Sequence, residues 1–285
     1  MSLGPPDLRD LPHRPKFDRL MARFRELGRV IVAYSGGVDS ALLFKVGTLA
    51  LGADCIGVTG RSETLTDEEF EAAAALARDH GLNLQTIQYS ELAVEGYAQN
   101  PTNRCYFCKH ELFSRLKDLV REWGVAAVVE GSNADDVNDW RPGMKAAEEL
   151  NIVSPLREAE LHKPEIRDLA RALGLANWDK PSAPCLSSRV AYGVEIDREK
   201  LDQVAAGERF LREQGFRILR VRHHGELARI EVAPEELDRL LAPEMRRRVA
   251  ARLLELGFRF VTIDLVGYRS GSLNEGLTRP ALKLS

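Results

Sequence analysis

Strand-sized apolar runs alternate with helical stretches through the first two thirds of this 285-residue chain, and this alternation restricts its fold more than any other feature. Runs rich in β-branched residues predict strands at 30–34, 55–59, 84–89 and 126–130. Helical periodicity predicts helices at 17–27, 41–51, 67–80, 109–123, 142–150 and 163–173. Because parallel strands need crossover connections, which helices supply, the pattern predicts an α/β fold whose parallel sheet has helices on both faces.

The alternation ends at 181–184, where two prolines within four residues indicate a domain boundary. Beyond this point we expect helices at 197–214, 234–241 and 244–256, a hairpin of strands 217–223 and 227–232, and a last strand at 258–266. This order is typical of a small α+β domain. The sequence therefore predicts a flexible arm at 1–16, a large α/β domain at 17–182 and a smaller α+β domain at 183–285.

The composition is typical of a globular protein with ample core. Hydrophobic residues make up 44% and charged residues 29% of the chain, and a net charge of −3 provides no basic excess for a nucleic-acid partner. The longest apolar runs are strand-sized, and the start is rich in proline and charge, unlike a secretory signal. We therefore expect a cytoplasmic protein with no membrane and no nucleic-acid partner.

The segment 35–40, S-G-G-V-D-S, joins the first predicted strand to a helix and is a candidate phosphate-binding loop. Gly36 and Gly37 let the backbone turn sharply and present its amides to an anion, and the helix adds the positive end of its dipole. The hydroxyls of Ser35 and Ser40 can donate further hydrogen bonds. The Walker and dinucleotide-binding patterns are absent, and the loop has no lysine to hold a transferring γ-phosphoryl group. Considered alone, two glycines after a strand also suit an ordinary tight turn.

Polar segments also follow the second and fourth predicted strands, at 59–62 (T-G-R-S) and 130–136 (E-G-S-N-A-D-D). Open α/β sheets bind ligands at the carboxyl ends of their strands. These segments are therefore candidates for adenine contact and for positioning a metal or a substrate. Each segment by itself also suits a turn or a helix cap.

The complete S-G-G-V-D-S string after an apolar strand resembles the signature of the PP-loop ATP pyrophosphatases, which include NAD synthetases, GMP synthetases, argininosuccinate synthetases and tRNA-thiolating enzymes. The resemblance implies cleavage of ATP between the α- and β-phosphates and transfer of AMP to a substrate oxygen. Asp39 would help hold Mg²⁺ against the phosphates, although a carboxylate here also complements the helix dipole. The ATP-binding residues implied are Ala33, Ser35, Gly36, Gly37, Asp39, Ser40, Thr59 and Gly131.

Further motifs resemble those of the LarE family over nearly the whole chain from about Phe17. They are P-C-L-S-S-R at 184–189 with Tyr192-Gly193, N-D-W-R-P-G at 138–143, R-V-R at 220–222 and G-Y-R-S-G at 267–271. The family's enzymes adenylate a carboxylate of pyridinium-3,5-biscarboxylic acid mononucleotide and convert it to a thiocarboxylate for the nickel-pincer nucleotide cofactor of lactate racemase. The resemblance implies a substrate-binding and oligomerisation role for 183–285, a homo-oligomer, and a nickel-inserting maturation protein as the downstream partner. The substrate-binding residues implied are Ser188, Arg189, Glu208, Arg220 and Arg222.

The cysteines bear on the source of the sulfur. In one form of the family a lone cysteine at the position of Cys185 gives up its own sulfur, but this chain also has a C-x-x-C at Cys105 and Cys108. It therefore resembles the [4Fe-4S]-dependent branch, which implies Cys105, Cys108 and Cys185 as cluster ligands, one iron left open for a labile sulfide, and Cys185 and Asp39 as catalytic residues. Cys55, in an apolar strand, is interpreted as a small buried hydrophobic residue.

Other interpretations remain open at the level of the sequence. Cys185 can act as a sacrificial sulfur donor, and the C-x-x-C also suits a zinc site or a redox pair. A tRNA thiolase of the same superfamily would use the same adenylation step. A non-catalytic ATP-binding protein would have the loop but release no pyrophosphate.

Overall fold

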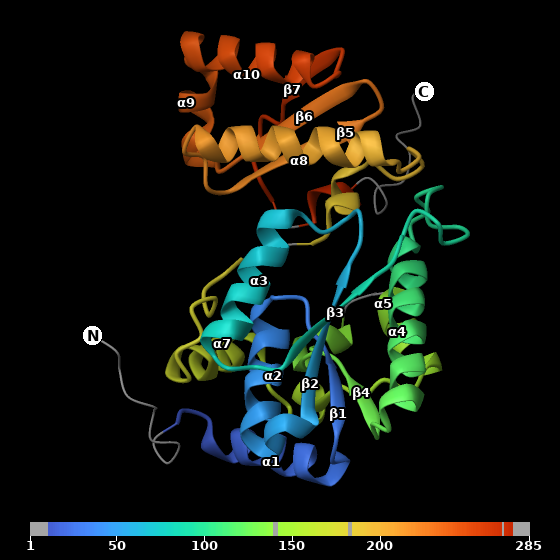
Figure 1. Ribbon diagram of the computed structural model, residues 1–285. Coiled ribbons are helices and arrows are strands. Elements are labelled where there is room, and N and C mark those ends of the chain that lie inside the picture. Colours follow the sequence, from blue (N-terminus) through green and yellow to red (C-terminus); the bar gives the residue numbers. More distant parts are fainter. Residues whose placement is uncertain (1–10, 139–141, 182–183, 270, 276–285) are drawn as a thin grey trace, which may run out of the picture. The chain divides into compact units, whose positions relative to one another are not determined.

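The computed structural model describes residues 11–138, 142–181, 184–269 and 271–275. The chain divides into two compact units (Figure 1). The first comprises Met1–Val94 and Asn103–Ala183, and the second comprises Glu95–Thr102 and Pro184–Ser285. The chain therefore enters the second unit and returns before its final crossing at 183–184, and the sequence did not indicate that residues 95–102 belong there.

The first unit contains a parallel sheet of strands β1 (Val30–Ala33), β2 (Cys55–Arg61), β3 (Leu84–Gln88) and β4 (Ala127–Val129). The strand order is β3-β2-β1-β4, so the chain builds the sheet outward from β1 in one direction and then places β4 on the other side of β1. The α/β prediction with a parallel sheet is confirmed. The reversal of strand order at β1 matters for function, because α/β sheets bind ligands at the carboxyl end of the strands at such a point.

Alternation of side chains along β1 divides the core of this unit into two layers. Val30 and Val32 pack with α1 (Arg14–Leu27), α2 (Val38–Leu51), α3 (Asp67–Asp79) and α7 (Lys163–Ala172). Ile31 packs on the opposite face with α4 (Arg104–Trp123) and α5 (Pro142–Glu149). Figure 1 shows α2 and α3 on one side of the strands and α4 on the other. Both faces are covered, which is why the strands are apolar throughout.

Two helices of this unit begin earlier than the sequence indicates. α1 begins at Arg14, because Pro15 in its first turn lacks only an N–H that would have no helical partner there. Residues 14–16 are therefore helical rather than part of an arm, and residues 1–10 of that expected arm lie outside the described residues. α4 begins at Arg104, so the C-x-x-C lies in the first turns of a helix rather than in a preceding loop. The short helix α6 (Pro155–Glu158) was not expected.

The start of α3 agrees with its predicted capping box. The Thr66 hydroxyl accepts a hydrogen bond from the Glu69 amide at 3.1 Å, and the Glu69 carboxylate accepts one from the Thr66 amide at 3.3 Å. Two amides without a helical partner are thereby satisfied by the sequence of one turn. Single 3-10 turns lie at η2 (Gly52–Asp54) and η3 (Ala134–Asn138).

The second unit has a three-stranded sheet of β5 (Leu219–His224), β6 (Leu227–Val232) and β7 (Phe260–Ile263), in that order. β5 and β6 form the expected antiparallel hairpin, and β7 runs parallel to β6. One face of the sheet packs on α8 (Arg198–Glu213), α9 (Leu237–Leu241) and α10 (Pro243–Glu255). Short turns lie at η4 (Leu186–Arg189), η5 (Pro234–Glu236) and η6 (Ser272–Asn274). This is the small α+β arrangement that the sequence predicts.

Residues 95–102 are fixed in the second unit by buried polar contacts. The Tyr97 ring is fully buried, and its hydroxyl lies 2.7 Å from the Ser187 hydroxyl. The side-chain amide of Asn100 donates to the carbonyls of Val190, Ala191 and Val194 at 2.8–3.3 Å. A segment from the middle of the chain is thus an integral part of this unit. No helix among the described residues is long and apolar enough to cross a membrane.

Candidate active site

The loop at 35–40 leaves the carboxyl end of β1 and starts α2, as the sequence predicts. Gly37 is the N-cap of α2, and the Ser40 hydroxyl donates to the Gly37 carbonyl at 3.1 Å. The hydroxyls of Ser35 and Ser40 lie 3.1 Å apart, and the Ser35 hydroxyl also accepts from the Gly37 amide at 3.4 Å. The first amides of α2 have no carbonyl partner within the helix. The loop therefore presents amides, hydroxyls and a helix dipole to an anion.

Two glycines make room for this loop. Gly36 has a φ of +73°, and a Cβ added there would lie 2.6 Å from the Cβ of Ala73 in α3. Gly131, just after β4, would place a Cβ 3.0 Å from the Ser40 amide nitrogen. The backbones of the two strand ends meet so closely that only glycine fits without displacing the loop. This close approach of bare backbone fits the phosphates of ATP.

Side chains from distant parts of the chain converge on the loop. Lys163 at the start of α7 pairs through its ammonium group with Asp39. The side-chain amide of Asn133 donates to the other Asp39 oxygen at 3.3 Å, and that of Asn177 donates to the Gly36 carbonyl at 3.1 Å. Sequence reasoning missed Lys163 and Asn177. The signal for Lys163 was available, because a cation in the first turn of a helix opposes the helix dipole and needs a reason to be there.

The segment after β4 is held by a network of carboxylates. Glu130 is buried and accepts from the Ser132 amide at 3.1 Å and the Ser154 hydroxyl at 2.7 Å, with the Lys109 ammonium at 3.7 Å. Asp135 lies 2.6 Å from the ring of His162. The hydrogen bond from that ring, and then the one from the amide of the following residue, lower the pKa of Asp135. These contacts fix the loop rather than leaving its acids open to solvent.

Ala33 and Thr59, both predicted to contact ATP, lie at the same edge of the sheet. Ala33 ends β1 and is half-buried. Thr59 is buried in β2, and its hydroxyl donates to the Tyr34 carbonyl at 2.9 Å. The hydroxyl of Thr59 thus ties the two central strands together beside the loop.

The second unit contains a buried charged layer on the hairpin. Val221 and Ile230 face the apolar core, whereas Arg220, Arg222 and Glu231 alternate with them and face the opposite side. Arg222 and Glu231 are nevertheless buried, with exposed fractions of 5% and 0%. The prediction that Arg220 and Arg222 share one strand face is confirmed by this register, and Glu231 was not anticipated.

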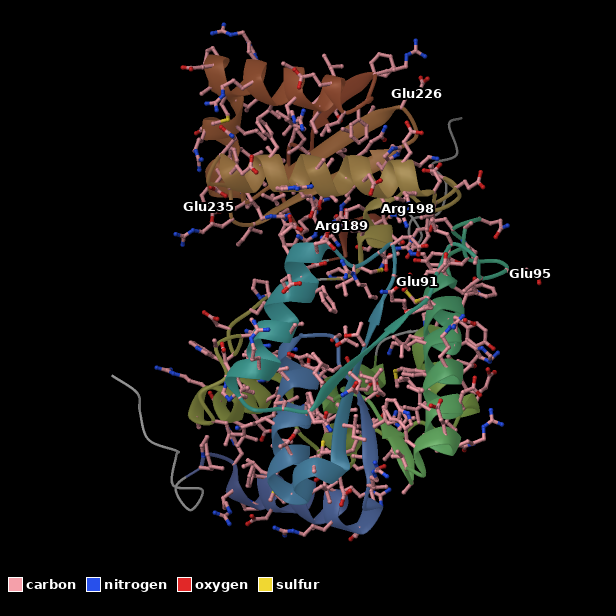
Figure 2. All side chains as sticks on the ribbon, in the orientation of Figure 1. Glu91, Glu95, Arg189, Arg198, Glu226 and Glu235 are labelled. Atoms are coloured by element: carbon pink, nitrogen blue, oxygen red, sulfur yellow. The ribbon has the colours of Figure 1, made fainter. Side chains whose placement is uncertain are left out.

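Arg189 and Glu208 form a second buried pair in this unit (Arg189 is labelled in Figure 2). The guanidinium of Arg189 grips the Glu208 carboxylate from Nε at 2.9 Å and Nη2 at 3.1 Å. Burial opposes ionisation of Glu208, but the charge and hydrogen bonds of Arg189 outweigh it and hold the pKa of that carboxyl below its usual value. Nη1 of Arg189 also donates to the Cys185 carbonyl at 3.0 Å and the Ser188 hydroxyl at 3.1 Å. Glu208 is therefore no ordinary exposed helix residue.

Positive charge exceeds negative charge around the hairpin. Arg222 donates to Glu231 at 2.8 Å, to the Ser272 hydroxyl at 2.9 Å and to the Ser188 carbonyl at 3.1 Å, but its buried Nε has no acceptor among the described residues. Arg220 forms no salt bridge within the described part of the chain. Burial, and then the nearby charge of Arg189, lower the pKa of Arg220. An anion bound here would supply the acceptors that this layer lacks.

The cysteines differ in their surroundings. Cys55 is fully buried, and burial raises the pKa of its thiol to about 12, which confirms its interpretation as a core residue. Cys105 is exposed and Cys108 half-buried at the start of α4, and the Cys108 thiol donates to the Cys105 carbonyl at 3.5 Å. Cys185 is half-buried and precedes η4 in the second unit.

No metal centre can be read from the described residues alone. Within them, no three His, Cys, Asp or Glu side chains are grouped so as to hold a metal ion. Two thiols three positions apart on a helix lie on one face and suit a shared metal, so α4 offers two of the three predicted cluster ligands. Asp39 offers one carboxylate, and one or two carboxylates with substrate phosphates are the usual protein ligands of Mg²⁺. Of the motifs noted in the sequence, residues 139–141 and Ser270 lie outside the described residues.

A parallel sheet whose chain reverses at β1, with S-G-G-V-D-S at the end of that strand, defines an ATP-using enzyme of the PP-loop class. In agreement, one of the chains of the glutamine-hydrolysing GMP synthase from Methanopyrus kandleri is 26% identical over 67% of this chain and 65% of its own length. No family model matches the chain.

Two closer relatives identify the branch. An uncharacterised protein of Synechocystis is 44% identical over 93% of this chain and 98% of its own length. The pyridinium-3,5-bisthiocarboxylic acid mononucleotide synthase of Lactiplantibacillus plantarum is 41% identical over 92% of this chain and 95% of its own length. The chain therefore belongs to the LarE family, to which that synthase belongs, and is an ATP-dependent sulfurtransferase by family.

Proposed function

We propose that this enzyme adenylates a carboxylate of pyridinium-3,5-biscarboxylic acid mononucleotide and replaces one of its oxygens with sulfur. The observation that carries the proposal is the glycine-only contact between Gly131 and the start of α2, where the phosphate loop lies at the reversal point of the sheet. The name of the L. plantarum relative supports the choice of substrate. The product would pass to a nickel-inserting maturation protein, and the enzyme would act in the cytoplasm as a homo-oligomer.

In the first step the loop binds the β- and γ-phosphates of ATP through the amides of α2 and the hydroxyls of Ser35 and Ser40. A substrate carboxylate oxygen attacks the α-phosphorus, and the bond to the bridging oxygen breaks, so that pyrophosphate leaves and an acyl adenylate forms. Asp39 would hold Mg²⁺, which neutralises charge that develops on the phosphates. Ala33, Thr59 and Gly131 would line the nucleotide at the adjoining strand ends.

The arginine layer of the second unit would bind the substrate's anionic groups. Arg220 has no salt bridge within the described residues and Arg222 has an orphaned Nε, so both can bind a phosphate or carboxylate. Glu208 fixes Arg189 in a two-pronged grip, which would orient it and the neighbouring Ser188 toward the substrate. Binding here would hold the acyl adenylate for the second step.

In the second step a sulfur nucleophile attacks the activated carbonyl carbon, AMP leaves with its bonding electron pair on oxygen, and a thiocarboxylate remains. We propose that Cys105, Cys108 and Cys185 bind a [4Fe-4S] cluster, which when bound supplies a labile sulfide at its open iron. Chain connectivity supports this ligand set. Asn100, five residues before Cys105, is bonded to the carbonyl of Val190, five residues after Cys185.

The test is anaerobic incubation with ATP, Mg²⁺, a sulfide source and the biscarboxylate nucleotide. Expected are pyrophosphate, a product in which sulfur replaces oxygen, about four irons per chain as a cubane requires, and a protein of unchanged mass. Loss of one sulfur from Cys185 with each turnover would instead identify it as the donor and remove the cluster. Release of pyrophosphate only with tRNA would overturn the substrate assignment.

A further inference from the structure

The phosphate loop lacks a cation of its own, and this leaves the charge of its ligand only partly balanced. Its segment 35–40 contains one acid and no basic residue. Amides and a helix dipole stabilise an anion, but the pyrophosphate that leaves during adenylation carries several negative charges. In the structure Lys163 brings an ammonium group to Asp39, in the first turn of α2 where that anion binds.

We propose that Lys163 is the phosphate-binding cation of this loop, paired with Asp39 until Mg²⁺ and the nucleotide bind and then transferred to the β- and γ-phosphates. This inference rests on the proposed function for the identity of the ligand. It assigns the role of the missing loop lysine to a residue 124 positions away in the sequence.

Lys163 is placed where a lysine has no reason to be on local grounds. It is the first residue of α7, whose N-cap is His162, so its charge faces the positive end of that helix's dipole. Its backbone is nevertheless held, because its amide donates to the Asp135 carboxylate at 2.7 Å. The side chain keeps an exposed fraction of 33%, so it is neither packed in the core nor fully in solvent. The chain thus positions this ammonium group toward the loop.

Asp39 is suited to exchange one cation for another. Its two carboxylate oxygens contact different partners, Lys163 at one and the Asn133 amide at the other, at 3.3 Å. A divalent ion that takes the Lys163 side of the carboxylate leaves Asn133 to keep its orientation. The displaced ammonium group then has the phosphates on α2 as its nearest anion, which is the exchange that the proposal requires.

The experiment measures binding of inorganic pyrophosphate with Mg²⁺ by calorimetry, which needs no substrate, cysteine or cluster. Lys163→Met should weaken binding about 10- to 100-fold, the range of one charge-assisted hydrogen bond, while AMP binding stays within about twofold. Lys163→Arg should recover most of the loss. Lys145→Met, which removes an exposed lysine that pairs with Glu149 in the same unit, should change neither.

A second arm tests the pairing with Asp39. Without Mg²⁺, Asp39→Asn should strengthen pyrophosphate binding because Lys163 is released, and the gain should disappear in the Asp39→Asn, Lys163→Met double variant. A gain that persists in the double variant would reflect only the lost carboxylate charge and would overturn the proposal. Equal losses of AMP and pyrophosphate in Lys163→Met would make it a structural ion pair and would also overturn it.

Failure of this inference differs from failure of the proposed function. If Lys163 governs pyrophosphate binding but no thiocarboxylate forms, the substrate assignment fails and the role of Lys163 stands. If the thiocarboxylate forms while Lys163→Met binds pyrophosphate normally, the opposite holds.

Discussion

Substituting Glu208 by Gln should strongly destabilise the second unit. The change removes the charge that balances Arg189, whose side chain has an exposed fraction of 4%, and leaves a guanidinium buried without a counter-ion. Breaking a buried ion pair from one side costs about 3–5 kcal/mol. The glutamine oxygen can still accept one of the present hydrogen bonds, which returns about 1 kcal/mol. We therefore expect a loss of about 3 kcal/mol in the free energy of unfolding of this unit.

The assay must report on the second unit alone. Trp123, Trp140 and Trp178 all belong to the chain segments of the first unit, so tryptophan fluorescence follows the wrong part of the protein. Hydrogen exchange of the α8 amides, read by mass spectrometry, follows the right one. A loss of about 3 kcal/mol should speed exchange of its most protected amides about 150-fold. Glu213→Gln, the same change at an exposed site on α8, is the matched control.

Acid provides a further check with a definite sign. The pKa of Glu208 is lowered in the folded protein, so its charge adds stability above its unfolded pKa of about 4.3, and this is lost as pH falls through the lower folded value. The difference between wild type and Glu208→Gln should therefore shrink below about pH 4.3. Exchange rates in the variant within threefold of wild type at pH 7 would refute the reasoning.

Three further predictions test other parts of the site. Gly131→Ala should lower ATP affinity tenfold or more, because the added methyl group meets the Ser40 amide at 3.0 Å; unchanged affinity would mean that the strand end can move away. Cys55, with a thiol pKa of about 12, should resist iodoacetamide at pH 8 in the metal-free folded protein while the exposed Cys105 reacts. Comparable labelling in a peptide digest would contradict the burial. Arg220→Met should weaken binding of the biscarboxylate nucleotide at least tenfold without lowering the melting temperature, since burial already disfavours its charge. A fall in melting temperature larger than that of the exposed Arg246→Met would assign Arg220 a structural role instead.

Local features of the sequence were enough for the elements and the loop. The apolar strand before 35–40 and the helix after it are set by side chains within a few residues of one another, so their pattern predicts both. The capping box at Thr66 and Glu69 is local in the same sense, and the structure reproduces it. The early start of α4 escaped prediction because Arg104 is buried there, and only tertiary packing determines that burial.

The tertiary structure decided the partners of the charged groups. Asp39 pairs with Lys163 across 124 positions, and Arg189 with Glu208 across 19, and neither spacing carries a periodicity that a sequence displays. Burial then gives these pairs their importance, because a charge removed from water must be matched by a group that only the folded chain brings near. By itself the sequence determined that this protein has a phosphate loop in an α/β domain. Which cation lies over that loop, and which arginines remain available for an anion, depended on contacts between segments distant in the chain.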